Sequence, residues 1–127
     1  MIVCRSLAPL AIIALTVLCQ SGCQTAAQPA APEQARDVLR QALEAWKQGE
    51  RPDAFQERTE ITAVERRWTQ GVRLLAYDFQ GEGRMHGFDW QGQVRLSLQD
   101  PLGKKTHERA IYNISTSPAR VVVRNES

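Results

Sequence analysis

The stretch FDWQGQVRLSLQ, residues Phe88–Gln99, decides the fold of this chain. Apolar residues recur in it at every second position, which is the period of a β-strand with one buried face and one solvated face. We therefore predict a long strand over residues 88–99. The residues expected on its buried face are Phe88, Trp90, Gly92, Val94, Leu96 and Leu98.

Two more strands are predicted downstream of this segment. A reverse turn at Asp100–Gly103, with proline and glycine where such a turn favours them, leads into a strand over residues 106–114. Ser117-Pro118 interrupts the pattern, and the three valines within Arg120–Arg124 predict a last short strand. The connections are short, so we expect consecutive strands to pair antiparallel.

The segments upstream predict two further strands. Residues 61–68 and 72–79 have a period of two and are joined around Thr69–Gly71. Gly81-Glu82-Gly83 is interpreted as the turn that separates the second of these strands from the central one. Glu65-Arg66-Arg67-Trp68 is interpreted as a solvated strand edge with the tryptophan packed inward.

An amphipathic helix precedes the strands. Its apolar residues lie three and four positions apart, which predicts a helix of about 16 residues that begins at Pro32 and is capped by Gly49. One further helical turn is expected between Pro52 and Phe55. The residues expected on the buried face of the long helix are Ala35, Val38, Leu39, Ala42, Leu43 and Trp46.

One N-terminal helix followed by four to five strands in meander order is an α+β arrangement, with the helix packed on a curved antiparallel sheet. This order of elements resembles the cystatin-like or NTF2-like superfold, in which a long curved sheet wraps one helix. The resemblance covers roughly residues 32–125 and implies the fold. The inhibitory loop of cystatins, Gln-x-Val-x-Gly, is not matched by Gln91–Arg95, so protease inhibition is rejected.

The beginning of the chain predicts export. Arg5 is the only charged residue before Glu33, and Leu7–Leu18 is an uncharged, largely apolar run. Such a run suits the core of a signal peptide and is shorter than the roughly 20 residues that span a bilayer. All three cysteines, Cys4, Cys19 and Cys23, lie in this region, so the rest of the chain folds without disulfides or zinc-thiolate sites.

Ser21-Gly22-Cys23 resembles the lipobox of bacterial lipoproteins, although Gln20 stands where an aliphatic residue is usual. The resemblance implies that Cys23 carries a thioether-linked lipid, becomes the first residue of the mature chain and holds the protein to a membrane on the periplasmic side. Residues 117–124 and the tryptophan-containing helix are similar to small uncharacterised bacterial envelope lipoproteins, a likeness that implies no activity. Cleavage after Ala27, which releases a soluble periplasmic or secreted protein, is the alternative.

The predicted organisation is therefore a signal peptide over residues 1–22, a disordered tether over residues 23–32 and one α+β domain over residues 33–127. The tether is small, uncharged and proline-containing, which is typical of a flexible linker. The formal net charge of the whole chain is only +2, so we expect no nucleic-acid partner.

The search for chemistry leaves one candidate region. NTF2-like proteins often have a pocket between helix and sheet, and acids near it in sequence are Asp78 and Asp89. Most of the aromatic residues are instead expected to form the core, because a small body needs them. The candidate lining residues are Trp46, Tyr77, Asp78, Phe88, Trp90 and Tyr112.

Catalytic and metal-binding motifs are not found. His86 and His107 lack the spacing of a metal site and are expected to be exposed at strand ends, and no serine lies in a nucleophile elbow. No metal, cofactor or enzymatic activity is predicted. The leading hypothesis is a lipid-anchored envelope protein with a non-catalytic interaction or structural domain. The second is a small-ligand-binding NTF2-like domain, and an enzyme that uses Asp78 or a histidine is the third.

Overall fold

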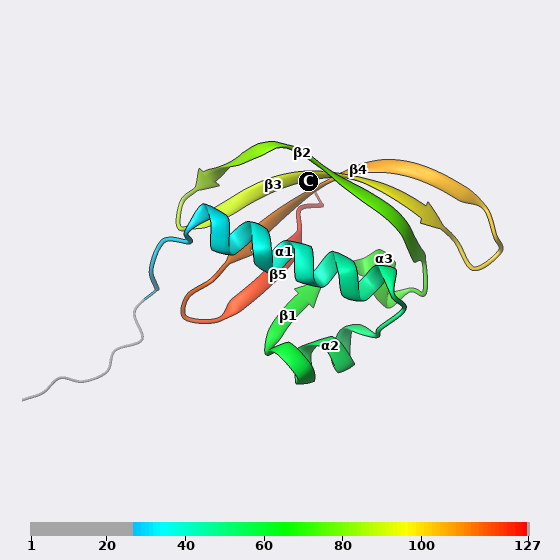
Figure 1. Cartoon of the computed structure of the whole chain (residues 1–127), viewed down its shortest axis with the longest axis horizontal. Coiled ribbons are helices and arrows are strands. Elements are labelled where there is room, and N and C mark those ends of the chain that lie inside the picture. The colour runs from blue at the N-terminus through cyan, green and yellow to red at the C-terminus, as the bar shows by residue number, and fades with distance from the viewer. Residues whose placement is uncertain (1–26, 127) are drawn as a thin grey trace, which may run out of the picture.

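A five-stranded sheet curves over one long helix in this α+β protein (Figure 1). The computed structural model describes residues 27–126, so the predicted signal peptide, Cys23 and most of the tether lie outside the described residues. Helix α1 spans Pro32–Lys47 and is followed by α2 (Pro52–Thr59), β1 (Ile61–Val64) and α3 (Arg66–Thr69). The remaining strands are β2 (Arg73–His86), β3 (Asp89–Gln99), β4 (Lys105–Ser115) and β5 (Arg120–Arg124).

Helix α1 confirms the prediction made from its periodicity. Pro32 stands at its first turn, where a missing backbone N–H costs nothing. Gly49 follows the helix with a φ of 86° and donates its N–H to the carbonyl of Trp46. The side chains that face the sheet are all buried: Ala35, Val38, Leu39, Ala42, Leu43 and Trp46.

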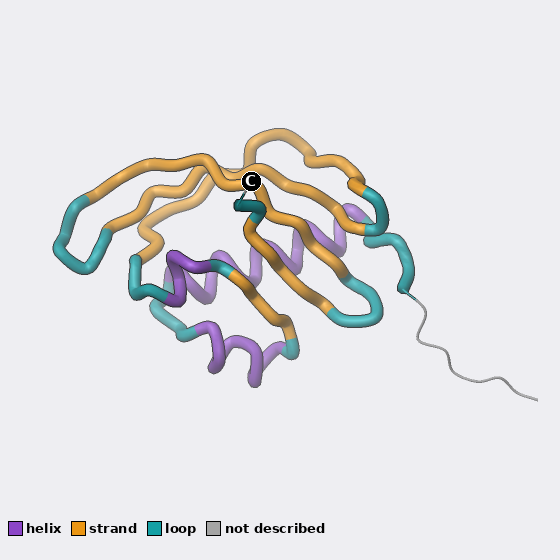
Figure 2. Tube along the Cα trace, turned by 180° about the vertical axis from the view of Figure 1, so that it is seen from behind, coloured by secondary structure: helices purple, strands orange, loops and turns teal. Residues whose placement is uncertain are grey.

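The sheet order is β1-β5-β4-β3-β2, which corrects the predicted antiparallel meander in one respect. Strands β2 to β5 do pair antiparallel in sequence order, but β1 pairs with β5 in parallel, with Ile61 opposite Arg120 and Val64 opposite Val123. The sheet is therefore mixed. Its two outer strands, β1 and β2, are consecutive in the sequence and are connected through α3, as Figure 2 shows from behind.

Between residues 27 and 126 the structure has three helices, where the sequence predicted one long helix and one further helical turn. Residues 61–68 do not form one strand, because β1 ends at Val64 and Arg66–Thr69 form the short helix α3. Trp68 is packed inward as expected, at 7% exposure, but from this helix. Helix α2 is longer than the single turn predicted, and its Phe55 is fully buried.

Strand β3 confirms the alternation that predicted it, with Trp90, Val94, Leu96 and Leu98 buried. Phe88 is the exception. It lies with Gly87 in the turn between β2 and β3, and its side chain is 58% exposed. The prediction of a buried Phe88 is therefore wrong, because the strand begins one residue later.

Gly81-Glu82-Gly83 is not the turn between strands but an irregularity inside β2, where the register shifts between Gln80 and Arg84. Both glycines have positive φ, 76° and 78°. A Cβ at Gly83 would lie 2.3 Å from the indole of Trp90, and one at Gly92 would lie 2.4 Å from it. The two glycines therefore make room for the buried Trp90 between neighbouring strands.

Candidate functional site

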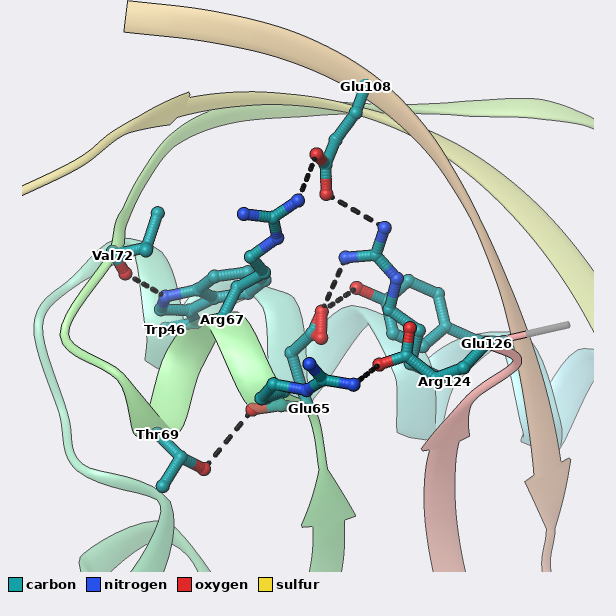
Figure 3. Close-up of polar contacts among 10 residues, drawn as sticks. Trp46, Glu65, Arg67, Thr69, Val72, Glu108, Arg124 and Glu126 are labelled. Atoms are coloured by element: carbon teal, nitrogen blue, oxygen red, sulfur yellow. Dashed lines mark hydrogen bonds and ion pairs between the residues drawn. The ribbon is translucent and has the colours of Figure 1, made fainter. Parts of the chain in front are cut away.

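The most distinctive polar feature of the described residues is a buried carboxylate, Glu65, which is 3% exposed. Glu65 follows β1 in extended conformation (φ −139°, ψ 108°) and precedes α3. Its backbone carbonyl accepts hydrogen bonds from the N–H and the hydroxyl of Thr69, at 3.1 and 3.2 Å. The first turn of α3 thus holds the backbone of Glu65 while its side chain points toward β4 and β5 (Figure 3).

Two donors meet one oxygen of this carboxylate. Arg124 Nη1 lies 2.9 Å from Glu65 Oε1, and the Tyr112 hydroxyl donates to the same oxygen at 3.3 Å. Glu65 Oε2 is buried and has no hydrogen-bond partner. Burial of an unpartnered carboxylate oxygen disfavours the ionised form.

The network continues to the surface through Glu108 (Figure 3). Arg124 Nη2 lies 2.8 Å from Glu108 Oε1, and Arg67 Nη2 lies 2.9 Å from Glu108 Oε2. One arginine therefore joins two carboxylates, and the outer carboxylate also pairs with an arginine from α3. We call Glu65, Arg67, Glu108, Tyr112 and Arg124 the Glu65 cluster.

The protonation of the cluster follows from burial and pairing. Burial raises the pKa of Glu65 above its ordinary value of 4.5, although the hydrogen bond and charge of Arg124 act in the opposite direction. Burial and the charge of Glu65 raise the pKa of Tyr112 well above its ordinary value. Burial lowers the pKa of Arg124, but the hydrogen bonds to Glu65 and Glu108 outweigh it and raise that pKa, so the guanidinium stays charged.

The space beside the Glu65 carboxylate is too small for a substrate. Glu65 and Tyr112 border a void of about 10 Å³ between α1, α3 and the sheet, which is about the room that one water needs. The other lining residues are apolar: Leu39, Ala42, Leu43, Trp46, Ala63, Trp68 and Val122. The arrangement can therefore tie α3, β4 and β5 together, and it offers no room for a reacting molecule at the Glu65 carboxylate.

A larger hollow lies on the outside, next to the end of α1. It is an open groove of about 630 Å³ whose lining includes Trp46, Trp68, Arg51, Asp53 and Arg73. The two indole rings stack with centroids 5.9 Å apart and are both nearly buried. Their N–H groups donate to backbone carbonyls, Trp46 to Val72 at 2.8 Å and Trp68 to Glu50 at 2.7 Å. Both tryptophans thus hold loops in place, and their indole N–H groups are already engaged in hydrogen bonds within the protein.

The structure distributes the predicted lining residues over three environments. Trp46, Trp90 and Tyr112 are 3%, 1% and 1% exposed and belong to the core. Tyr77 is half-buried, and its hydroxyl donates to Glu44 Oε2 at 2.8 Å. Contrary to the prediction, Asp78 is exposed and lies opposite Arg95 on the other face of the sheet, and Phe88 is exposed at a turn, so neither lines the helix–sheet interface.

The two histidines lie far apart. His86 stands opposite Asp89, at one end of β3, and His107 stands opposite Ser97. Asp89 and Ser97 are eight residues apart, which is about 26 Å along the strand. Both histidines are exposed. Among the described residues, no three His, Cys, Asp or Glu side chains are grouped so that they could hold a metal ion. Helices long and apolar enough to cross a membrane are likewise not found between residues 27 and 126.

Sequence reasoning missed the charged members of the Glu65 cluster, although the pattern contained a signal for two of them. Glu108 alternates with the buried Ala110, and Arg124 alternates with the buried Val122, so both stand on the inward face of their strands. Opposite charges on one buried face predict a pair. Glu65 gave no such signal, because it lies between two elements. Its burial contradicts the prediction that it belongs to a solvated strand edge. Comparison with protein-family models, curated proteins and solved structures finds no match to this chain.

Proposed function

We propose that this chain is an exported protein of the bacterial cell envelope, held to a membrane by a lipid on Cys23 and facing the periplasm. The observation that carries the proposal is the position of Ser21-Gly22-Cys23 shortly after the apolar run Leu7–Leu18. Small residues before a cysteine allow a signal peptidase to reach the backbone there. The protein loses membrane affinity when its signal peptide is removed, and the thioether lipid then replaces that affinity.

The domain, in this proposal, serves interaction or structure and not catalysis. The filled space between α1 and the sheet supports this role, because a void of about 10 Å³ beside Glu65 admits at most about one water. The small-ligand-binding hypothesis relied on an open, aromatic-walled pocket at this place. The residues expected to line that pocket include Trp46, Trp90 and Tyr112, and all three belong to the hydrophobic core.

We also infer that the domain has the cystatin-like arrangement. Support comes from the antiparallel run β2-β3-β4-β5, which curves over α1 in the order that the superfold has (Figure 1). The parallel strand β1 is an addition at the β5 edge. This inference concerns architecture and carries no activity with it.

Phase partition tests the anchor directly. The mature protein is extracted from cells that express the full chain and separated in Triton X-114, and its intact mass is measured. We expect the wild type in the detergent phase and Cys23→Ala in the aqueous phase. Cys19→Ala is the matched control, because a cysteine inside the removed leader leaves the partition unchanged. A wild type that stays aqueous, or a mature chain that begins at Gln28, contradicts the proposal.

A further inference from the structure

Two exposed apolar residues lie in or beside the turn between β2 and β3. Phe88, at the second position of this two-residue turn, is 58% exposed, and Met85, at the end of β2, is 41% exposed. Gly87 has a φ of 65° and supplies the backbone conformation that such a turn needs. The turn itself does not require an aromatic residue, so the exposure of Phe88 has no explanation in the fold.

The start of the described chain is fastened to this same turn. The backbone N–H of Ala30 donates to the carbonyl of Phe88 at 2.9 Å, and Ala30 is buried. Figures 1 and 2 both show the N-terminal segment leaving the domain beside the β2–β3 turn. Cys23 precedes Ala30 by seven residues, and seven residues span at most about 25 Å. A lipid on Cys23 therefore keeps this end of the domain close to the bilayer.

We propose that the β2–β3 turn is the membrane-facing end of the domain and that Phe88 and Met85 insert into the interfacial layer of the bilayer that holds the anchor. This inference rests on the proposed lipid anchor and adds the orientation of the domain. Phenylalanine is among the residues with which interfacial segments bury themselves at the headgroup boundary, and exposed apolar groups gain free energy by leaving water there.

The lipid anchor explains why a contact of only two side chains is enough to orient the domain on the membrane. One phenylalanine and one methionine bind a membrane weakly on their own. A short tether makes their insertion intramolecular, which replaces the dilute bulk concentration by a high effective one. Charges near the turn are of both signs, with Arg84 against Glu82 and Asp89. The contact is therefore apolar and does not depend on anionic lipids.

The other end of β3 provides a matched control. Leu102, in the β3–β4 turn, is 94% exposed, more than Phe88. It lies beyond the far end of the 11-residue strand β3, which measures about 33 Å along its length from the β2–β3 turn. Leu102 is thus an exposed apolar residue at a hairpin tip that the anchor does not hold near the bilayer.

The experiment uses the mature lipidated protein in phosphatidylcholine vesicles. A single cysteine is introduced by Met85→Cys or Leu102→Cys and labelled with a fluorophore, and its collisional quenching by aqueous iodide is measured. The sulfur of Cys23 is blocked by its thioether and is not labelled. We expect quenching of the label at position 85 to be several-fold weaker than at position 102, a larger difference than the exposures of 41% and 94% in the domain itself account for. Adding Phe88→Ser to Met85→Cys is expected to remove most of this protection, and adding phosphatidylglycerol to change it little.

Flotation of the vesicles separates the failure of the two proposals. Protein that floats with the vesicles but shows equal quenching at positions 85 and 102 overturns the orientation and leaves the anchor intact. Protein that does not float overturns both. Protection at position 85 that survives Phe88→Ser also overturns the insertion of Phe88, and circular dichroism checks that each variant is folded.

Discussion

Arg124 and Glu65 form a nearly solvent-free ion pair: Nη1 lies 2.9 Å from Oε1, and the side chains are 12% and 3% exposed. The pair joins β5 to the residue that precedes α3, across 59 positions of sequence. The net contribution of a buried ion pair is small when both partners are present, because desolvation offsets their attraction. Substitution of one partner leaves the charge of the other partner buried without compensation.

Arg124→Ala is therefore expected to lower the free energy of unfolding by about 3–5 kcal/mol. Both Glu65 and Glu108 lose their shared partner in this variant. Urea unfolding measures the loss. Arg95→Ala is the control, since Arg95 is exposed on the opposite face of the sheet, and we expect a change within about 0.5 kcal/mol. Equal effects of the two substitutions contradict a structural role for the pair.

The raised pKa of Glu65 predicts a definite dependence of stability on pH. A carboxyl whose pKa rises on folding holds its proton more tightly in the folded state, so its favourable contribution is complete below 4.5 and is lost as the pH rises through the folded pKa. The stability of Glu65→Gln relative to wild type should therefore increase as the pH rises above 4.5. Urea unfolding at a series of pH values gives this difference.

Glu44→Gln is the control for that trend, because it should have the opposite sign. The hydrogen bond from Tyr77 lowers the pKa of Glu44 below its ordinary value, so the contribution of Glu44 is present at higher pH and lost as the pH falls. A relative stability of Glu65→Gln that falls with rising pH, as for Glu44→Gln, would show that Arg124 outweighs burial at Glu65.

Trp46→Ala is expected to cost about 3–5 kcal/mol of unfolding free energy, as for other buried large aromatic residues. Trp46 is 3% exposed, stacks on Trp68 and donates its indole N–H to Val72 at 2.8 Å. Trp46→Phe keeps an aromatic ring and loses this hydrogen bond, so a smaller loss of about 1–3 kcal/mol is expected. A loss below about 1 kcal/mol for Trp46→Ala would show that α1 does not pack as described.

Gly83→Ala should destabilise the domain more than Gly81→Ala. Both residues have positive φ, 78° and 76°, so both substitutions strain the backbone alike. Only at Gly83 would a Cβ meet the indole of Trp90, at 2.3 Å, whereas at Gly81 nothing lies within 4 Å. The clash is expected to add about 1–3 kcal/mol to the common strain, which thermal or urea unfolding would resolve. Equal losses would argue against Trp90 lying over Gly83.

The periods of the sequence predicted what depends on local pattern alone. The spacing of three and four in α1 and the alternation in β3 reflect which side chains face the core, and those faces are as predicted except at Phe88. The parallel pairing of β1 with β5 depends on which distant strand lies alongside, and no local period records that. Glycines with positive φ serve turns and bulges equally, so Gly81 and Gly83 could not be assigned by residue type.

The candidate site was less predictable than the fold. Phe88 lies two positions before Trp90 and so fits the alternation of β3, although the strand begins only at Asp89. The alternation therefore could not show that Phe88 belongs to the turn. Asp78 is an acid between apolar neighbours, but the alternation of β2 alone sets its side chain on the solvated face. The buried Glu65 and its half-buried partner Arg124 come from segments 59 residues apart and are understood only as a pair.

The parallel edge strand has a consequence for how the chain reaches its native state. Among the described residues β1 pairs only with β5, with Ile61 opposite Arg120, so β1 cannot form its native pairing until β5 has been synthesised. High contact order of this kind slows folding, and until it is complete the backbones of β1 and β4 remain open templates for intermolecular pairing. Loss of the last few residues would therefore do more than shorten the chain: it would leave an aggregation-prone intermediate for the proteases that clear misfolded proteins.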